Sequence, residues 1–216
     1  MSKRLNLPVY AEVDADGRMH AASAERNAGA ICDLVAAHAP GAGTALELAS
    51  GTGQHTVALA RRLPQLAWQP SDVDAGRRAS VDAWARAEGL VNIAPAIEVD
   101  ATSPGWAALN GGKALILLAN LLHLVSQAEA RTLIAETAQA LAPGGIFILY
   151  GPFLRDGETT SDGDTAFHAS LRQQDPEIGY KDDWDVIDWL HGAFLDLVQV
   201  VEMPSNNLAF VSRRPA

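Results

Sequence analysis

The sequence predicts an α/β fold in which helices cover both faces of a mostly parallel sheet. Between residues 44 and 150, apolar strand-like runs alternate with helical segments at the spacing of βαβ units. The run "ALILLAN" at 114–120 is apolar throughout, which is typical of a parallel strand covered on both faces. Two further strand-like runs, 197–203 and 206–214, are joined by the turn-like "PSN". We expect them to add an antiparallel hairpin at the edge of a doubly wound sheet.

The elements of the alternating region follow from apolar runs, helical periodicity and capping residues. Five strands are expected, at 44–50, 66–72, 92–100, 114–120 and 146–150. Four helices are expected, at 23–38, 55–63, 75–89 and from 126 to the glycine at 144. Ser126 with Glu129 forms the capping box of the last helix. Residues 1–21 are polar and without periodicity, so we expect an irregular N-terminal segment.

The segment from 154 to 193 separates the alternating region from the terminal hairpin. Its sequence "DWDVIDWLHGAF" predicts an amphipathic helix with the apolar residues Trp184, Ile187, Trp189, Leu190 and Phe194. Such a helix can simply pack on the sheet. Alternatively, the segment is a lid that closes an apolar pocket over a small molecule and, with the N-terminal segment, excludes water.

Length and composition limit the classes of protein to consider. The 216 residues fit a single domain, 1–216, that is large enough to bury a core. A net charge of -10 and the lack of a basic run argue against nucleic acid as a partner. The longest apolar stretch, "ALILLANLLHLV", is too short to span a membrane, and no signal peptide is visible. The single cysteine, Cys32, fits a cytoplasmic location.

A glycine turn follows the first of the five expected strands, in the stretch "LELASGTGQH" at 46–55. Gly51 and Gly53 would let the backbone pass close to a ligand. In a doubly wound sheet, ligands bind at the carboxyl ends of the strands. Polar residues occupy or follow four of these ends: Ser50, Asp72, Asp100 and Asn120. Asp72 follows Gly53 by 19 residues, the distance at which an acid accepts hydrogen bonds from a ribose diol.

Several nucleotide ligands are compatible with such a turn. The dinucleotide motif G-x-G-x-x-G would require glycine where this chain has Thr56, which disfavours an NAD-dependent oxidoreductase. A phosphate-binding loop would require a G-K pair, and no lysine follows the turn. The six histidines are dispersed and no C-x-x-C pattern occurs, so no metal site is expected.

The order of these segments resembles a class I S-adenosylmethionine-dependent methyltransferase, with a Rossmann-like, seven-stranded, mostly parallel sheet and an antiparallel C-terminal hairpin. The family motif D/E-x-G-x-G-x-G would correspond to "ELASGTG", in which Ala49 replaces the first glycine. The resemblance implies that S-adenosylmethionine binds here and leaves as S-adenosylhomocysteine. The residues it implies for the cofactor are Arg26, Glu47, Ala49, Ser50, Gly51, Gly53, Asp72, Asp100, Ala101 and Asn120.

Each of these residues has an implied place in that resemblance. The backbone from Gly51 to Gly53 would lie under the methionine part of the cofactor, while Asp72 would hold the ribose. Asp100, with Ala101, would lie at the adenine. Asn120 would line the pocket near the sulfonium, and Glu47 would order the glycine loop or contact the methionine end indirectly. Arg26 suits a carboxylate of the cofactor or of an acidic substrate, or it belongs to a solvated helix face.

A closer resemblance involves seven short motifs spread from about residue 23 to residue 213. They are "AERN", "SGTGQH", "WQPSD", "NLLHL", "YGPF", "LRQQDP" and "MPSNNL". Together they resemble the methyltransferase-like 26 family, long catalogued as a domain of unknown function. That resemblance implies a fold and a cofactor, but no substrate.

Two residues near the expected site are candidates for catalysis, although methyl transfer mainly requires alignment of the nucleophile. His123, three residues past Asn120, is placed to act as a general base or as a hydrogen-bonded structural histidine. Tyr150 ends the fifth strand and could close the pocket. His55 could touch the cofactor or the substrate. The segment after Asn120 also lacks the prolines and aromatic residue of amino-directed nucleic-acid methyltransferases, which argues against adenine or cytosine in nucleic acid as the substrate.

The sequence therefore favours a methyltransferase that transfers a methyl group to oxygen, nitrogen or sulfur of an unidentified small molecule. A methyltransferase-like protein that binds the cofactor without turnover, as a regulator, is the alternative, because no compelling base stands out. An NAD-dependent oxidoreductase is a weaker third. The acceptor and the oligomeric state do not follow from the sequence.

Overall fold

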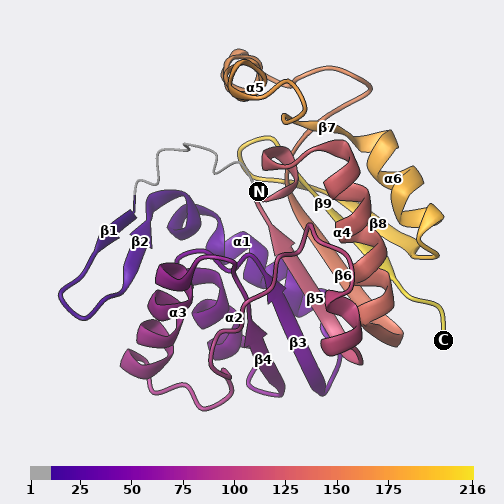
Figure 1. Cartoon of the computed structure of the whole chain (residues 1–216). Helices are drawn as coiled ribbons and strands as arrows, with labels where there is room; N and C mark the ends of the chain where they lie inside the picture. Colours follow the sequence, from indigo (N-terminus) through magenta and orange to yellow (C-terminus); the bar gives the residue numbers. More distant parts are fainter. Residues whose placement is uncertain (1–10) are drawn as a thin grey trace.

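A seven-stranded sheet organises residues 11–216, the part of the chain that this computed structural model describes (Figure 1). Its strands are β3 (Gly43–Leu48), β4 (Leu66–Pro70), β5 (Lys113–Ala119), β6 (Leu141–Leu154), β7 (Lys181–Asp182), β8 (Asp196–Met203) and β9 (Asn207–Arg213). The order is β4-β3-β5-β6-β9-β8, and β7 pairs with the end of β6. Strands β3 to β7 are parallel, whereas β9 is antiparallel to both β6 and β8. The mostly parallel sheet with a C-terminal antiparallel hairpin is thus confirmed.

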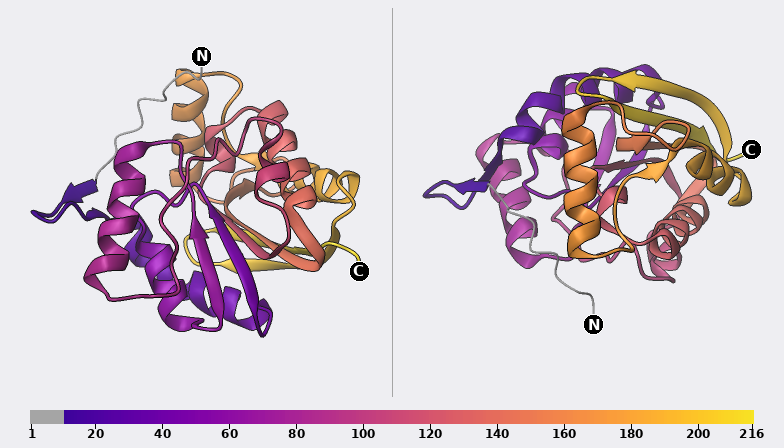
Figure 2. Two further views of the ribbon diagram at one scale, coloured as in Figure 1. Left: turned by 60° about the horizontal axis from the view of Figure 1, so that its bottom comes forward. Right: turned by 90° about the horizontal axis from the view of Figure 1, so that it is seen from above.

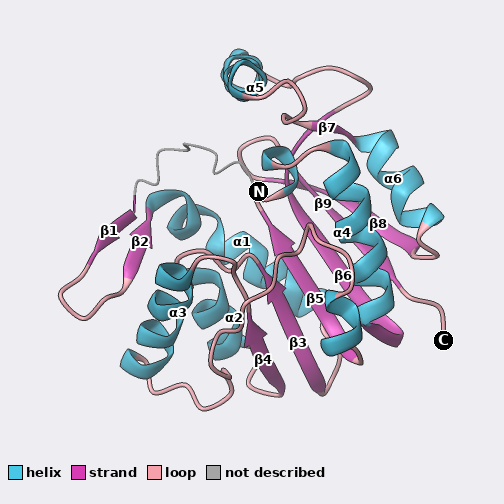
Figure 3. Cartoon of the chain, in the orientation of Figure 1, coloured by secondary structure: helices cyan, strands magenta, loops and turns pink. Residues whose placement is uncertain are grey.

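Helices cover both faces of this sheet (Figure 3). The helices are α1 (Ala22–His38), α2 (Gln54–Arg62), α3 (Ala75–Ala87), α4 (Gln127–Ala140), α5 (Asp162–Gln174) and α6 (Asp183–Gly192), with short 3-10 turns η1 (Trp106–Leu109) and η2 (Leu122–Leu124). Alternate residues of the central strands enter two cores. Ala45 and Leu115 pack with α1 and α2, whereas Leu46 and Ile116 pack with α4 and α6. This alternation is what a strand covered on both faces requires.

The predicted ends of two elements have the expected local chemistry. Ser126 accepts a hydrogen bond from the Glu129 amide, and the Glu129 carboxylate accepts one from the Ser126 amide, so the capping box is confirmed. The turn between β8 and β9 has positive φ angles of 59° at Ser205 and 60° at Asn206. Two consecutive left-handed residues match the twist of a tight antiparallel hairpin.

The predicted strand at 92–100 was wrong as a continuous strand. The segment makes only two isolated parallel bridges to the β4 side, Trp68 with Ile93 and Ser71 with Ile97. Pro95 lies between these bridges and has no N–H to donate to a sheet. The segment still runs along the edge of the sheet next to β4. Its last residue, Asp100, therefore lies on the side of the carboxyl ends of the strands, as predicted.

The N-terminal segment is not irregular throughout, which corrects the prediction for 1–21. Residues 1–10 lie outside the described part, but β1 (Ala11–Val13) and β2 (Met19–Ala21) form an antiparallel hairpin. The Met19 amide donates to Ser80 Oγ at 2.8 Å, and Trp84 Nε1 donates to the Met19 carbonyl at 3.0 Å. The Ala21 amide donates to Gln54 Oε1 at 2.7 Å. These bonds hold the hairpin to α3 and to the start of α2.

The segment 154–193 contains two helices rather than one. The second, α6, coincides with the predicted amphipathic helix and buries Val186, Trp189 and Leu190. However, Trp184 is 62% exposed and Phe194 is 83% exposed, so these two do not belong to its apolar face. The first, α5, was not predicted. Seen from above, α5 crosses the upper end of the sheet (Figure 2).

Candidate functional site

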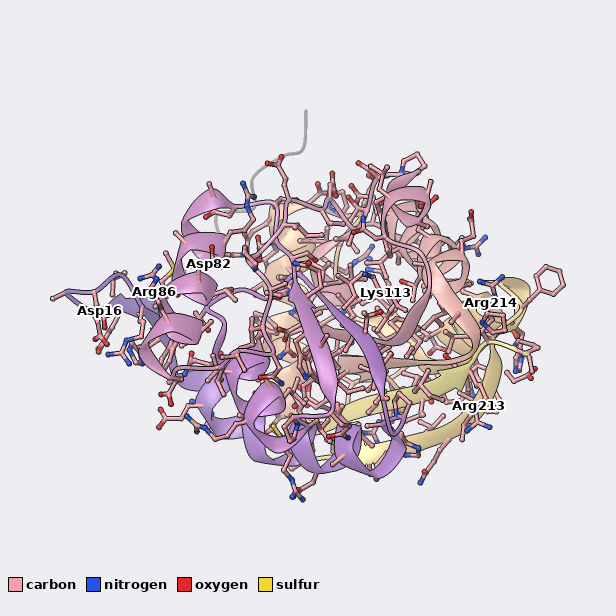
Figure 4. All side chains as sticks on the ribbon, turned by 90° about the horizontal axis from the view of Figure 1, so that it is seen from below. Asp16, Asp82, Arg86, Lys113, Arg213 and Arg214 are labelled. Carbon is pink, nitrogen blue, oxygen red and sulfur yellow. The ribbon has the colours of Figure 1, made fainter. Side chains whose placement is uncertain are left out.

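The carboxyl ends of the parallel strands meet at one edge of the sheet, beneath α5 (Figure 1). The backbone reverses sharply at two neighbouring ends. Ala49, after β3, has a φ angle of 50°, and Asn120, after β5, has a φ angle of 57°. This left-handed conformation costs alanine about 1–2 kcal/mol, whereas asparagine adopts it more readily. Strain of this kind concentrates at functional sites. Figure 4 shows the opposite end, where Lys113 begins β5 and Arg213 ends β9.

The glycine turn after β3 is shaped by its contact with α3. Gly53 has a φ angle of 93°, and a Cβ atom there would lie 2.8 Å from the Cα of Val81. Gly51 also has a positive φ angle, 59°, but a Cβ there would meet nothing closer than 3.9 Å. Gly53 is therefore required both by conformation and by close packing, whereas Gly51 is required by conformation alone.

Asp72 connects the glycine turn to the end of β4. Asp72 is 1% exposed, and its carboxylate accepts hydrogen bonds from the Gly51 amide at 3.0 Å and the Asp74 amide at 2.9 Å. Arg77 Nη1 lies 3.8 Å from the same carboxylate. An ionised carboxylate offers about four acceptor positions, so two backbone bonds leave capacity for a ligand hydroxyl. The ribose role of Asp72 stays a prediction.

Glu47 lies beneath the turn, on the face of β3 that packs against α2. Its side chain is 2% exposed, and the Thr56 hydroxyl of α2 donates to its carboxylate. Burial raises the pKa of Glu47 to about 7, and the Thr56 hydrogen bond opposes this change. Ser50 donates its hydroxyl to the Glu47 carbonyl at 3.2 Å and accepts from the Ser71 amide at 3.1 Å. These bonds fix the turn to both strands and to α2.

Asp100 lies at the end of the 92–100 segment. It accepts hydrogen bonds from the Thr102 amide at 3.0 Å, the Thr102 hydroxyl at 2.6 Å and the Ser103 hydroxyl at 2.8 Å. Burial acts to raise the pKa of Asp100, but these bonds outweigh it and the pKa is lowered. Ala101 is buried beside it, and the Asp72 amide donates to the Ile97 carbonyl at 3.1 Å. The segment is thereby held next to the Asp72 end.

A second polar group lies on the α1 side of the glycine turn. His55 Nε2 lies 2.7 Å from Asn27 Oδ1, and burial lowers the pKa of His55 to about 4. Tyr150, at the end region of β6, is buried; burial raises its pKa and the Asn27 side chain opposes this change. Its hydroxyl has no hydrogen-bond partner of ordinary geometry among the described residues. Arg26 is exposed and makes no ion pair or hydrogen bond within that same part of the chain.

His123 is more enclosed than a catalytic histidine in an open site. Its ring centroid lies 5.9 Å from that of Phe167 and 6.1 Å from that of Tyr180, so α5 and the segment after it cover the ring. Its Nδ1 has no hydrogen-bond partner in residues 11–216. Burial, and then the charge of Lys181, lower the pKa of His123 to about 3. The imidazole is therefore neutral at pH 7 and is a weak proton acceptor.

The structure thus brings most predicted residues to one edge. Glu47, Ser50, Gly51, Gly53 and Asp72 form one bonded unit around the glycine turn, and Ala49 is the chain neighbour of Ser50 within it. Asn120 and Tyr150 adjoin each other, because the Asn120 amide donates to the Tyr150 carbonyl at 2.9 Å. Thr56 was missed as a functional partner. The sequence did contain a signal. Thr56 occupies the position of the third glycine of the dinucleotide motif, and its hydroxyl, which glycine would lack, donates to Glu47.

Two further properties concern only residues 11–216. No helix there is long and apolar enough to cross a membrane. No group of three or more histidine, cysteine or acidic side chains in this range is arranged to hold a metal ion.

Several solved structures of similar fold carry methyltransferase names. An O-methyltransferase family protein from Burkholderia thailandensis matches at a TM-score of 0.74 with 20% identity, over 88% of this chain and 56% of that one. An O-methyltransferase family 2 protein from Planctomyces limnophilus, in complex with apigenin, matches at 0.75 with 18% identity, over 89% and 57%. The S-adenosylmethionine-dependent methyltransferase SibL matches at 0.72 with 19% identity, over 90% and 56%. This chain spans just over half the length of each.

These matches define the class of fold: the chain has the Rossmann-like fold of S-adenosylmethionine-dependent methyltransferases. Residues 18–214 match the family described as "Protein of unknown function (DUF938)". The chain belongs to this family.

Proposed function

We propose that this protein is an S-adenosylmethionine-dependent methyltransferase that acts on a small molecule, at oxygen, nitrogen or sulfur. The observation that carries the proposal is the bonded unit in which Asp72 accepts from the Gly51 amide and closes the glycine turn onto β4. Similar folds in proteins with methyltransferase names, SibL among them, support this choice of activity.

The donors and acceptors at this edge fit the cofactor. The backbone from Gly51 to Gly53 would lie under its methionine part, and the spare acceptor positions of Asp72 would take the ribose hydroxyls. Asp100 and Ala101 would adjoin the adenine. When bound, S-adenosylmethionine supplies an activated methyl group with its own leaving group.

The remaining residues would bind, orient and exclude water. Arg26 is exposed and without a charged partner in the described part of the chain, so it is available for a carboxylate. Asn120, held in its left-handed conformation at the end of β5, would line the methyl-transfer position. Tyr150 and His123 would form its wall, because both are buried and neither is ionised at pH 7.

The likeness to methyltransferase-like 26 proteins extends the proposal. Four of the shared motifs, "AERN", "SGTGQH", "NLLHL" and "YGPF", lie at or next to the edge that carries the glycine turn. We therefore infer that this chain is related to that family and that the shared motifs serve its cofactor site. We also propose a cytoplasmic location, since the single cysteine cannot form an internal disulfide, and no nucleic-acid partner, since the net charge is -10.

A protein that binds the cofactor without turnover is the second candidate. It is favoured by the two histidines of the site, which are weak proton acceptors and therefore poor general bases. Burial lowers the pKa of His55 to about 4 and of His123 to about 3. A methyl acceptor that needs no general base would remove this argument. The two candidates share the cofactor site and differ only in whether a methyl group is transferred.

Calorimetric titration with S-adenosylmethionine, S-adenosylhomocysteine and NAD tests the shared part. We expect binding of the first two but not of NAD, and Asp72→Ala to weaken binding at least about ten-fold, equivalent to about 1.4 kcal/mol. Asp188→Ala, at an exposed position of α6, is the matched control and should bind like the parent chain. If neither methionine derivative binds to the folded protein, the proposal is wrong. Methyl transfer from labelled cofactor to a small-molecule library then separates the two candidates.

A further inference from the structure

A separate pocket lies beyond β7, away from the glycine turn. It has a volume of about 530 Å³ and is formed by the start of α4, the end of α5, the segment after α5 and the first part of α6. Its size is in the range of small-molecule sites, roughly 300–1,000 Å³. None of the residues proposed to hold the cofactor lines it. The pocket therefore requires its own explanation.

The wall of this pocket contains a buried positive charge. Lys181 is 8% exposed, and its Nζ donates to the Val125 carbonyl at 2.7 Å and to the Gly179 carbonyl at 2.8 Å. Gly179 and Ser126, the neighbour of Val125, both line the pocket, which places the ammonium at its wall. An ammonium has three donors, and both partners here are neutral carbonyls. One donor and the full charge are left without a bonded anion among the described residues.

The charge of Lys181 is maintained at neutral pH. Burial, and then the charge of Arg172, lower the pKa of Lys181 to about 8, and Glu129 acts in the opposite direction. The group is still mostly protonated at pH 7. Arg172 also lines the pocket, is exposed, and makes no hydrogen bond or ion pair within residues 11–216. Lys181 and Arg172 thus bring two cations to one cavity, and neither has a hydrogen-bonded or ion-paired acid among the described residues.

The rim of the same pocket carries acids. Asp182 is already engaged, because it accepts from the Gly157 amide at 2.6 Å and the Trp184 amide at 3.0 Å. Glu177 and Asp185 are exposed, and their carboxylates accept no hydrogen bond from the described residues. The buried charge of this pocket is therefore positive. The carboxylates of Glu177 and Asp185 lie at the exposed rim, where water and salt screen their charge.

A ligand with charges of both signs matches this arrangement better than a simple anion or cation. We propose that the pocket binds a small zwitterion of the α-amino acid class. Its carboxylate would face Lys181 and Arg172, and its ammonium would face the exposed acids of the rim. Its side chain would be apolar, because the remaining wall includes Leu154, Ile178 and Trp189.

Three related compounds isolate the two ligand charges. The full chain is titrated with L-phenylalanine, L-phenylalanine amide and N-acetyl-L-phenylalanine, by calorimetry and by ligand-observed NMR. Loss of the carboxylate should weaken binding about ten-fold or more, since a hydrogen bond to a buried charge is broken. Loss of the ammonium should weaken it by up to about five-fold, since its partners are exposed. Equal binding of the three compounds, or no binding of L-phenylalanine at 10 mM, would overturn the proposal.

Variants assign the binding to this pocket. Arg172→Gln should weaken L-phenylalanine binding by up to about five-fold, because an exposed charge contributes modestly. Arg86→Gln is the control. Arg86 is also exposed, but it lies in the last turn of α3, on the opposite side of the molecule from α6 (Figure 1). Lys181→Met should abolish discrimination between the acid and its amide if that variant folds. If neither Arg172→Gln nor Lys181→Met changes the affinity, the ligand binds elsewhere and the proposal is wrong.

The proposal is independent of methyl transfer. S-Adenosylhomocysteine also carries an amino acid group, so L-phenylalanine is titrated again in its presence at saturation. Unchanged affinity is expected for separate sites. Competition would place L-phenylalanine in the cofactor site and overturn the proposal.

Discussion

Glu47 should make the stability of this protein fall as the pH rises from about 4.5 to 7. Its carboxyl is buried beneath the glycine turn with the Thr56 hydroxyl as its hydrogen-bond partner. Burial raises its pKa from 4.5 to about 7. Between these values the native state binds more protons than the unfolded chain, so the free energy of unfolding decreases with pH. Replacement by glutamine, which is neutral and of similar shape, should remove this decrease.

The size of the effect follows from the same two pKa values. Since one pKa unit corresponds to about 1.4 kcal/mol, the change from 4.5 to about 7 is equivalent to about 3 kcal/mol. Two buried histidines act in the opposite direction. Burial lowers the pKa of His55 to about 4 and of His123 to about 3, so their contributions to stability rise with pH up to about 6.5. These contributions cancel when Glu47→Gln is compared with the parent chain at each pH.

Urea unfolding at pH 5, 6, 7 and 8, followed by tryptophan fluorescence, measures the difference. The buried Trp68 provides a signal from the core beside β3. We expect the stability of Glu47→Gln, relative to the parent chain, to increase by about 2.5 kcal/mol from pH 5 to pH 8, because part of the effect already lies below pH 5. Glu25→Gln, at an exposed position of α1, is the control and should give a constant difference. A constant difference for Glu47→Gln as well would refute the reasoning.

Substitutions at three further positions test the local structure of the glycine turn and of the start of α4, each by urea unfolding. Gly53→Ala should destabilise the fold by at least about 2 kcal/mol and weaken S-adenosylhomocysteine binding. The Cβ of the alanine would lie 2.8 Å from the Cα of Val81, at a position with a φ angle of 93°. Stability equal to that of the parent chain would contradict this. Ala49→Gly should stabilise the fold by about 0.5–1 kcal/mol, since relief of the left-handed strain exceeds the entropy that glycine costs. A loss of stability would show that the strain is absent. Ser126→Ala should cost about 1 kcal/mol by removing the capping box with Glu129, whereas Ser126→Thr should not.

The sheet could be predicted because its central strands carry a strong apolar signal. Strands β3, β5 and β6 are buried on both faces, so almost every residue in their central parts is apolar, and the run itself reveals the strand. The capping box of α4 is equally local, since Ser126 and Glu129 bond to each other. Such features are determined within a few residues and are visible without tertiary information.

The elements that were missed depend on distant contacts. The β1–β2 hairpin has strands of three residues and is held by Ser80 and Trp84, about sixty residues away in the chain. Helix α5 buries only Leu171 along its length, so it has no apolar stripe from which a helix could be predicted. The segment 92–100 reads as a strand, but Pro95 interrupts its pairing. For the β1–β2 hairpin and for α5 the sequence pattern is weak, whereas in 92–100 the apolar pattern predicts a strand and does not account for the effect of Pro95 on pairing.

In the site, too, the local turn could be predicted from the sequence, whereas the chemical state of a side chain enclosed by distant residues could not. The glycine turn and the acid at the end of β4 could be predicted because both are fixed by strand ends. The state of His123 could not, because Phe167 and Tyr180 come from a segment more than forty residues later, and they enclose the ring that the sequence leaves exposed. Enclosure lowers its pKa to about 3, which removes the proton-accepting role that its position suggests. If methyl transfer occurs here, the acceptor atom must therefore reach the site already able to react, and the main task of the enzyme is alignment rather than proton removal.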